Sequence, residues 1–386
     1  MAGFRRLLRY LPLVAALFST VPGWAQWRPD LSGYLANLPI YQHLSDPILP
    51  GFPQTLKLDL SRLRLRASWS PGRNTLIGME YEAVALYASQ NAPFLSLQPN
   101  RTRQRWDWGK TAIRRDHFTV SHFLDRLYLR QDFDWGNLTA GRQRVAWGSG
   151  RIWNPTDLFN PVNPLAFDKL EKDGADLLTG QIYLGNFTDL TLVVNPLESS
   201  ESSNAGFRFR TNYRTYDLAV TGGYFDKRAV LGGDFAGNLW VAGFRGEGIV
   251  SADPDSLGRN YLSYILGVDL QFTPLIYGLV EFHFNGRGGE TPSQYDLEGL
   301  SEGRLLNLGR RYLFIQTTYQ IHPLVMLLAG HNINLDDRSG LVLLSATWSW
   351  RANADLSAGS QIFYGNPGDE YRYYPASYYL KLQVHF

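Results

Sequence analysis

The last ten residues of the chain, 377–386, alternate strictly between apolar and polar side chains, and they constrain the fold more than any other stretch. One face carries Tyr378, Leu380, Leu382, Val384 and Phe386. This period of two is the pattern of a β-strand with one apolar and one wet side. A chain that ends in mid-strand fits a sheet that closes on itself, where the last strand pairs with the first. The alternative is the final strand of a soluble sandwich.

The terminal aromatic residue, Phe386, adds a second signal to this strand. The ending resembles the C-terminal signature of bacterial outer-membrane β-barrels. That resemblance implies that Phe386 is an assembly signal, which the outer-membrane assembly machinery reads.

The first 25 residues have the organisation of a secretory signal peptide. Three arginines between residues 5 and 9 precede an apolar run over residues 11–18, and small residues follow as far as Ala25. The alternative is an N-terminal membrane anchor, but the run is shorter than the roughly 20 residues that span a bilayer. We therefore expect residues 1–25 to be removed near Ala25 and residues 26–386 to form one outer-membrane barrel domain.

The composition excludes several classes of protein. Cysteine is absent, so a disulfide scaffold, a thiolate metal site and a cysteine nucleophile are all excluded. The formal charge of +2 is too small to indicate a nucleic-acid partner. The histidines show no metal-binding or catalytic spacing, so we expect a protein that is not an enzyme and that uses no cofactor and no metal. Tyr (22), Phe (21), Trp (11) and Gly (37) suit aromatic girdles and tight turns.

Segments of period two recur along the whole mature chain and predict about eighteen strands. The fold class that follows is all-β: a transmembrane, antiparallel, up-and-down β-barrel with a single domain. Residues 229–237 are the least distinct strand, and they are included because both termini must emerge on one side, which requires an even number. Residues 89–116 are expected to form a surface loop, and residues 138–147 a strand.

Charged side chains fall on the polar faces of these strands and should point inward, because an arginine facing lipid costs about 2–4 kcal/mol. The basic arc that we expect to line the pore consists of Arg62, Arg64, Arg66, Arg126, Arg130, Arg142, Arg144, Arg208 and Arg210. The acidic pore-lining set consists of Glu80, Glu82, Glu247, Asp269 and Glu281. These charges could form an ion-pair lattice that stiffens the wall, a surface that selects anions, or both.

Residues 148–174 are rich in proline, asparagine and aromatic residues, which suits a rigid, folded loop. We expect this loop to fold into the lumen as a constriction loop, and the alternative is a lid on the outer surface. The candidate constriction residues are Arg151, Trp153, Asn154, Asp157 and Phe159.

The stretch 141–148, Gly-Arg-Gln-Arg-Val-Ala-Trp-Gly, is followed by Arg-Ile-Trp-Asn-Pro-Thr-Asp at 151–157. Together with the arginine-rich strands and residues 332–340, these motifs are similar to bacterial outer-membrane barrels of the alginate-export type and to related porin-like families. The resemblance implies an eighteen-stranded barrel with an arginine-lined pore for an anionic polysaccharide.

The function predicted from the sequence is an outer-membrane porin or exporter channel that passes small or anionic solutes. The alternative is a non-enzymatic barrel that serves as a sheath or docking partner in an outer-membrane complex. The expected partners are membrane lipid and lipopolysaccharide, the assembly machinery, and an anionic solute or polysaccharide, but not nucleic acid. The sequence leaves the oligomeric state open.

Overall fold

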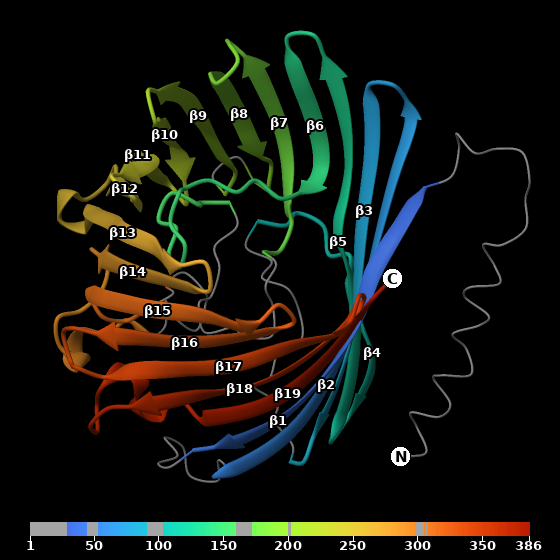
Figure 1. Ribbon diagram of the computed structural model, residues 1–386. Coiled ribbons are helices and arrows are strands. Elements are labelled where there is room, and N and C mark those ends of the chain that lie inside the picture. The colour runs from blue at the N-terminus through green and yellow to red at the C-terminus, as the bar shows by residue number, and fades with distance from the viewer. Residues whose placement is uncertain are drawn as a thin grey trace, which may run out of the picture.

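The computed structural model describes residues 29–44, 53–90, 103–159, 172–199, 202–297, 305 and 307–386, and Figure 1 shows their strands arranged in a ring. The expected signal peptide, residues 1–25, lies outside the described residues.

The described strands are β1 (Asp30–His43), β2 (Thr55–Gly72), β3 (Thr75–Ala88), β4 (Gly109–Arg115), β5 (Phe118–Phe133), β6 (Gly136–Gln143), β7 (Ala175–Tyr183), β8 (Asp189–Asn195), β9 (Asn204–Tyr213), β10 (Tyr216–Phe225), β11 (Arg228–Leu239), β12 (Ala242–Ala252), β13 (Tyr261–Thr273), β14 (Ile276–Asn285), β15 (Arg311–His322), β16 (Val325–Asn334), β17 (Gly340–Arg351), β18 (Ala354–Tyr364) and β19 (Ala376–His385). Three short 3-10 helices, η2 (Leu257–Arg259), η3 (Pro292–Gln294) and η4 (Glu370–Tyr373), lie between strands.

The sheet closes through its first and last strands. β1 pairs with β2 along one edge and with β19 along the other, where Asn37 lies opposite Leu382. Every strand pairing is antiparallel, and every pairing except that of β4 with β5 joins neighbours in the ring. Strands β1, β2, β3 and β5 to β19 therefore form a closed barrel of eighteen strands among the described residues. The predicted all-β antiparallel barrel with about eighteen strands in a single domain is confirmed.

The least distinct predicted strand is present as β11. It pairs along its length with β10 and β12. The turn that leads into it has two consecutive residues of positive φ, Asp226 (51°) and Lys227 (64°). Such a turn matches the twist of the strands that it joins, which fixes their register despite the weak pattern.

Two predictions of strand extent were wrong. Residues 109–115, expected in a loop, form β4, which pairs with the first half of β5. The strand expected over residues 138–147 ends at Gln143, where the chain leaves the wall. Two residues earlier, Gly141 has a φ of +119°, which departs from regular strand geometry. Segment 103–108 bridges the gap that results: the amide of Asp176 in β7 donates to the carbonyl of Arg103 at 3.1 Å, and the amide of Leu124 in β5 donates to that of Trp108 at 3.1 Å.

The two faces of the barrel differ in character. On β13, Leu262, Leu266 and Val268 are exposed on the outer face, whereas Ser263 and Ile265 are buried on the inner face. Exposed apolar side chains recur in this way around the ring, so the outer surface is apolar. No helix in the described parts of the chain is long and apolar enough to cross a membrane.

The inner face is not polar everywhere. A cluster of buried apolar side chains occupies the inner side of β1, β2 and β3 near the ends away from the short turn at Gly72: it includes Leu38, Leu58 and Val84. These side chains share a face with Arg62 and Arg64, which lie further along β2. The assumption that apolar faces always point outward therefore fails in this part of the wall.

Candidate functional site

The segment that follows β6, residues 144–159, lies inside the ring of strands, as the green trace in Figure 1 shows; we call it the inner loop. Its two ends pack on the inner wall. Trp147 and Phe159 meet edge to face with ring centroids 5.1 Å apart, and both belong to a buried cluster with Leu177 of β7, Val193 of β8 and Ile249 of β12. The inner loop therefore follows the wall from β7 to β12.

A carboxylate in the middle of β12, Glu247, holds the next part of the inner loop. Its oxygens accept the backbone amides of Ser149, of Gly150 at 3.0 Å and of Thr156 at 3.2 Å. A Cβ on Gly148 would lie 2.2 Å from the same carboxylate, and the φ of Gly148 is +98°. Only glycine suits this position, since any side chain would both strain the backbone and displace Glu247.

A second carboxylate, Glu281 in the middle of β14, holds the tip of the inner loop. It accepts the amides of Arg151 at 2.8 Å, Ile152 at 3.1 Å and Trp153 at 2.8 Å. Glu247 and Glu281 are 4% and 0% exposed. They therefore face the inner loop and not an open passage, which differs from the pore-lining placement that we expected from alternation alone.

The indole of Trp153 anchors the tip of the inner loop beyond β14. It is 2% exposed, stacks on His283 with ring centroids 5.1 Å apart and meets Phe314 of β15 edge to face at 6.2 Å. Its Nε1 donates to Oδ1 of Asn307 at 3.0 Å. Aromatic packing and a satisfied indole N–H together fix one position for this side chain.

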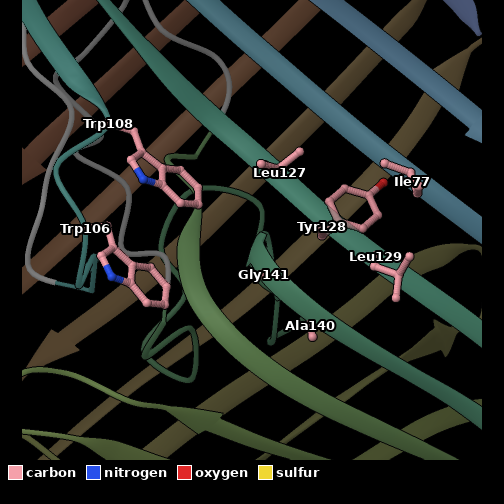
Figure 2. Close-up of a pocket in the computed structure, with 8 residues that line it drawn as sticks. All are labelled: Ile77, Trp106, Trp108, Leu127, Tyr128, Leu129, Ala140 and Gly141. Atoms are coloured by element: carbon pink, nitrogen blue, oxygen red, sulfur yellow. The ribbon is translucent and has the colours of Figure 1, made fainter.

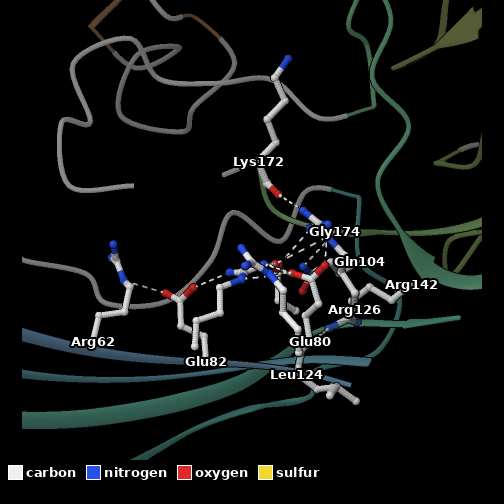
Figure 3. Close-up of polar contacts among 12 residues, drawn as sticks. Arg62, Glu80, Glu82, Gln104, Leu124, Arg126, Arg142, Lys172 and Gly174 are labelled. Carbon is white, nitrogen blue, oxygen red and sulfur yellow. Dashed lines mark hydrogen bonds and ion pairs between the residues drawn. The ribbon is translucent and has the colours of Figure 1, made fainter. Parts of the chain in front are cut away.

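The opposite arc of the wall carries a lattice of ion pairs, part of which Figure 3 shows. Arg64 of β2 is 0% exposed and pairs with Glu80 at 2.6 Å, with Glu82 at 2.6 Å and with Asp125. Arg126 pairs with the other oxygen of Glu80 at 2.8 Å. Buried charges need such partners, since an unpaired one would be very costly.

The remaining arginines of the expected basic arc, apart from Arg144, also meet carboxylates. These pairs are Arg62–Glu82 (3.0 Å), Arg66–Glu80 (3.7 Å), Arg130–Asp132 (2.8 Å), Arg142–Asp176 (2.8 Å), Arg208–Asp234 (2.9 Å) and Arg210–Asp189 (2.7 Å). The acid Asp269 pairs in turn with Arg245. The arc is thus largely neutralised by neighbouring acids.

Arg142 is enclosed in the wall and does not line a passage. It is 1% exposed, donates to the carbonyls of Leu124 at 3.1 Å and Trp106 at 2.5 Å, and lies 4.3 Å from the ring of Trp108. The expected placement in the lumen was wrong because β6 ends here and segment 103–108 covers the guanidinium.

Two guanidinium groups of the inner loop have a different environment. Arg144 and Arg151 are exposed, and neither forms an ion pair within the described parts of the chain. Burial alternates from Arg144 to Trp147: Val145 and Trp147 pack toward the wall, whereas Arg144 and Ala146 are exposed. Arg144 therefore points away from the wall, toward the lumen.

The other expected constriction residues stabilise the loop itself. Asn154 donates from Nδ2 to the carbonyl of Gly150 at 3.0 Å, which closes a tight turn. Asp157 is buried and pairs with Lys172. Phe159 also meets Phe225 of β10 edge to face at 4.9 Å. Residues 160–171 of the expected constriction loop lie outside the described residues.

The sequence analysis missed the acids that pair with the arc, Asp125, Asp176, Asp189 and Asp234, together with Asn307. Their signal was present in part: Asp189 lies directly opposite Arg210 once β8 and β9 are paired, whereas Asp234 of β11 reaches Arg208 of β9 across β10. Metal-ligating residues do not cluster anywhere in the described residues.

A closed antiparallel barrel of eighteen strands, with a loop held on its inner wall, defines a porin-type barrel. Comparison with solved structures agrees on the fold. The crystal structure of Acinetobacter baumannii OccAB4 matches with a TM-score of 0.59 at 9% identity, over 94% of this chain and 99% of that one. Pseudomonas aeruginosa OccD3 (OpdP) matches with a TM-score of 0.55 at 9% identity, over 94% and 92%.

At such low identity these similarities establish the fold alone. No protein-family model matches the chain, and no curated protein matches it. The resemblance to alginate-export barrels therefore stays a prediction, while the porin-type architecture stands on the structure itself.

Proposed function

We propose that the protein is a bacterial outer-membrane channel that passes small anionic solutes between the inner loop and the charged wall. The outer face of the barrel is apolar, as a membrane-spanning barrel requires. The inner loop narrows the interior and is held by Glu247 and Glu281 at the middle of their strands. A solute that passes this level must pass Arg144 and Arg151.

The two exposed guanidiniums carry the proposed anion preference. The other arginines of the arc have carboxylate partners, so their fields are largely cancelled at short range. No carboxylate among the described residues pairs with Arg144 or Arg151, and a narrow, low-dielectric passage focuses the field of such charges on a passing ion. A polyanionic polysaccharide would gain from a long basic track, whereas two local charges favour a small anion.

Planar-bilayer recordings test this proposal. The double variant Arg144→Gln/Arg151→Gln should keep a conducting pore and shift the reversal potential in a salt gradient toward cation preference. The control is Arg210→Gln, since Arg210 is half-exposed but paired with Asp189, and its replacement should change selectivity little. If the purified protein forms no conducting pore, the proposal fails and the docking-partner alternative takes its place.

Location and orientation need a separate test. We propose that residues 1–25 are cleaved and that the short turns face the periplasm. Cysteines introduced at Gly289 and Gly368 should react with an impermeant reagent on intact cells, whereas cysteines at Pro274 and Pro323 should not. Labelling of the cysteines at Pro274 and Pro323 alone would show that the barrel has the opposite orientation. The measured intact mass of the mature protein should equal that of a chain that begins at Gln26. A mass that includes residues 1–25 would refute cleavage.

A further inference from the structure

An apolar hollow lies on the outer face of the barrel, where segment 103–108 joins β5 and β7 beyond the end of β6. Figure 2 shows it with the far wall of the barrel behind it; Trp106, Trp108, Leu127, Leu129 and Ala140 contribute to its lining. The hollow is about 490 Å³. Leu127 and Leu129 are exposed residues of the outer face, and Trp106 is also exposed.

The hollow has a built shape. Trp106 and Trp108 stack with ring centroids 5.9 Å apart and an interplanar angle of 7°, which gives one flat aromatic side. The floor is formed by residues with little or no side chain, Ala140 and Gly141, next to the larger Leu127 and Leu129. A flat aromatic side, a shallow floor and aliphatic edges fit a linear acyl chain.

Basic side chains stand above this hollow on the same face. Lys110 lies opposite His122 and Arg115 opposite Phe118 in the pairing of β4 with β5. Phe118 in turn lies opposite the exposed Tyr87, so this face of the hairpin is the outer one. Lys110 and Arg115 are exposed and form no ion pair within the described residues. Leu127 and His122 are separated along β5 by about 13 Å, four regular steps of 3.3 Å, because Asp125 is the extra residue of a bulge. This length is close to the thickness of one leaflet.

We propose that this surface binds a phosphorylated acyl lipid of the surrounding membrane. One acyl chain lies in the hollow against Trp106 and Trp108, and the phosphate of the headgroup lies near Lys110 and Arg115. Basic residues beside a membrane-facing apolar surface recognise anionic headgroups. A second copy of this chain fits less well, because its corresponding face would present the same positive charges. The inference rests on the proposed membrane location but not on channel activity.

Native mass spectrometry of the purified, detergent-solubilised protein tests this site, with diphosphorylated lipid A and the same lipid after removal of its phosphates as probes. The wild-type protein should retain the phosphorylated probe at least about tenfold better, which corresponds to about 1.4 kcal/mol. Lys110→Gln/Arg115→Gln should abolish that preference, and Trp106→Ala/Trp108→Ala should weaken retention of both probes. Heat-modifiable gel mobility should show that each variant is folded.

Matched controls lie at the opposite end of the barrel. Trp135 stacks on Phe133 with ring centroids 5.1 Å apart, and Arg214 and Arg351 lie over the rings of Tyr213 and Trp350. Trp135→Ala and Arg214→Gln/Arg351→Gln should retain lipid as the wild type does. Equal loss in these controls, an unchanged preference in Lys110→Gln/Arg115→Gln, or a protein dimer that depends on Trp106 and Trp108 would overturn the proposal. Bilayer conductance should be unchanged in Lys110→Gln/Arg115→Gln, which separates this test from that of the channel.

Discussion

Trp153 donates its indole N–H to the side-chain oxygen of Asn307 at 3.0 Å, and this bond joins the tip of the inner loop to the segment that precedes β15. Nδ2 of Asn307 in turn donates to the hydroxyl of Tyr371 at 3.3 Å, in η4 before β19. The position of the inner loop is therefore fixed both by the wall and by the connections at one end of the barrel.

The first prediction concerns the anchor at Glu281. Glu281→Ala removes the acceptor of three loop amides, and hydrogen bonds to a charged group contribute about 1.5–3 kcal/mol each. The tip of the inner loop should detach, so single-channel conductance and current noise in planar bilayers should both rise. The matched control is Glu290→Ala, because Glu290 is half-exposed and pairs with Arg310 in a connection outside the wall. Unchanged conductance in Glu281→Ala would show that the loop does not restrict the passage.

The second prediction concerns the centre of the lattice. Arg64→Met leaves Glu80, Glu82 and Asp125 without their shared partner, and breaking a buried pair costs about 3–5 kcal/mol. The urea concentration at which the barrel unfolds in detergent should fall markedly. Arg210→Met is the control, since its side chain is 53% exposed and a surface pair contributes about 0–1 kcal/mol. Equal effects of the two replacements would mean that Arg64 contributes no more than a surface pair.

The sequence predicted the barrel well because alternation and short turns are local signals. Alternation alone places Arg64 and Glu82 on the inner face, and they lie opposite each other although an irregularity between Trp69 and Gly72 shifts the register by one residue from that of the turn. Asp125 could not be predicted in this way. It is the extra residue of a bulge in β5, where Arg126 lies opposite Glu80 but Leu124 opposite Tyr81. Strict alternation places Asp125 with the outward Leu127, and the bulge turns it inward.

The candidate site was less predictable than the fold, because it depends on what covers each charge. Alternation indicates that Glu247 and Glu281 point inward, but it does not show that a loop separated by about a hundred residues of chain donates its amides to them. Alternation likewise places Arg142 on the lumen face of a longer strand. It does not show that β6 ends at Gln143, one residue after Arg142. Non-local contacts of this kind leave no periodic signal in the sequence.

A buried carboxylate in η4 connects the segment before β15, the start of β15 and the end of β16. Glu370 is 5% exposed and accepts the amide of Leu308 at 2.8 Å, the hydroxyl of Tyr312 at 2.5 Å and Nδ2 of Asn334 at 2.8 Å. Burial raises the pKa of Glu370 from 4.5 to about 7, and the nearby Asp337 adds to the increase.

The third prediction is a pH dependence of this connection. The closed arrangement binds the proton of Glu370 more tightly than an opened one, in which the pKa returns to its ordinary value. The contribution of Glu370 to the stability of the closed arrangement is therefore fully present below the ordinary pKa of 4.5 and is lost as the pH rises through about 7. Protection of the Leu308 amide from hydrogen exchange, corrected for the intrinsic rate, should fall by roughly tenfold to a hundredfold between about pH 5 and pH 8.

The variant Glu370→Gln isolates the titrating group. It keeps one acceptor oxygen but carries no ionisable proton, so protection of the Leu308 amide should no longer change over this pH range. Glu290→Gln, in the connection between β14 and β15 that also carries Leu308, changes a half-exposed carboxylate and should keep the wild-type dependence. A dependence that survives in Glu370→Gln would assign the titration to another group.

The last prediction concerns closure of the barrel, where its first strand, β1, pairs with its last strand, β19. The amide of Gly33 donates to the carbonyl of Phe386 at 2.9 Å, and the amide of Phe386 donates back at 3.1 Å. The ring of Phe386 lies over Gly33, where a Cβ would be 2.9 Å from its Cζ and 2.2 Å from the carbonyl oxygen of Arg64. Gly33→Val should therefore hinder pairing of β1 with β19.

Deletion of Phe386 should hinder closure as well, because it removes both backbone bonds and exposes Gly33. The fraction of heat-modifiable, folded protein in isolated outer membranes should fall in both variants. Phe386→Tyr keeps the ring and both bonds and should assemble normally. If Phe386→Tyr fails as deletion does, the identity of the terminal aromatic matters beyond its packing on Gly33. If the variant that lacks Phe386 assembles normally, closure does not depend on the packing of Phe386 on Gly33, and Phe386 is not the assembly signal that we expected.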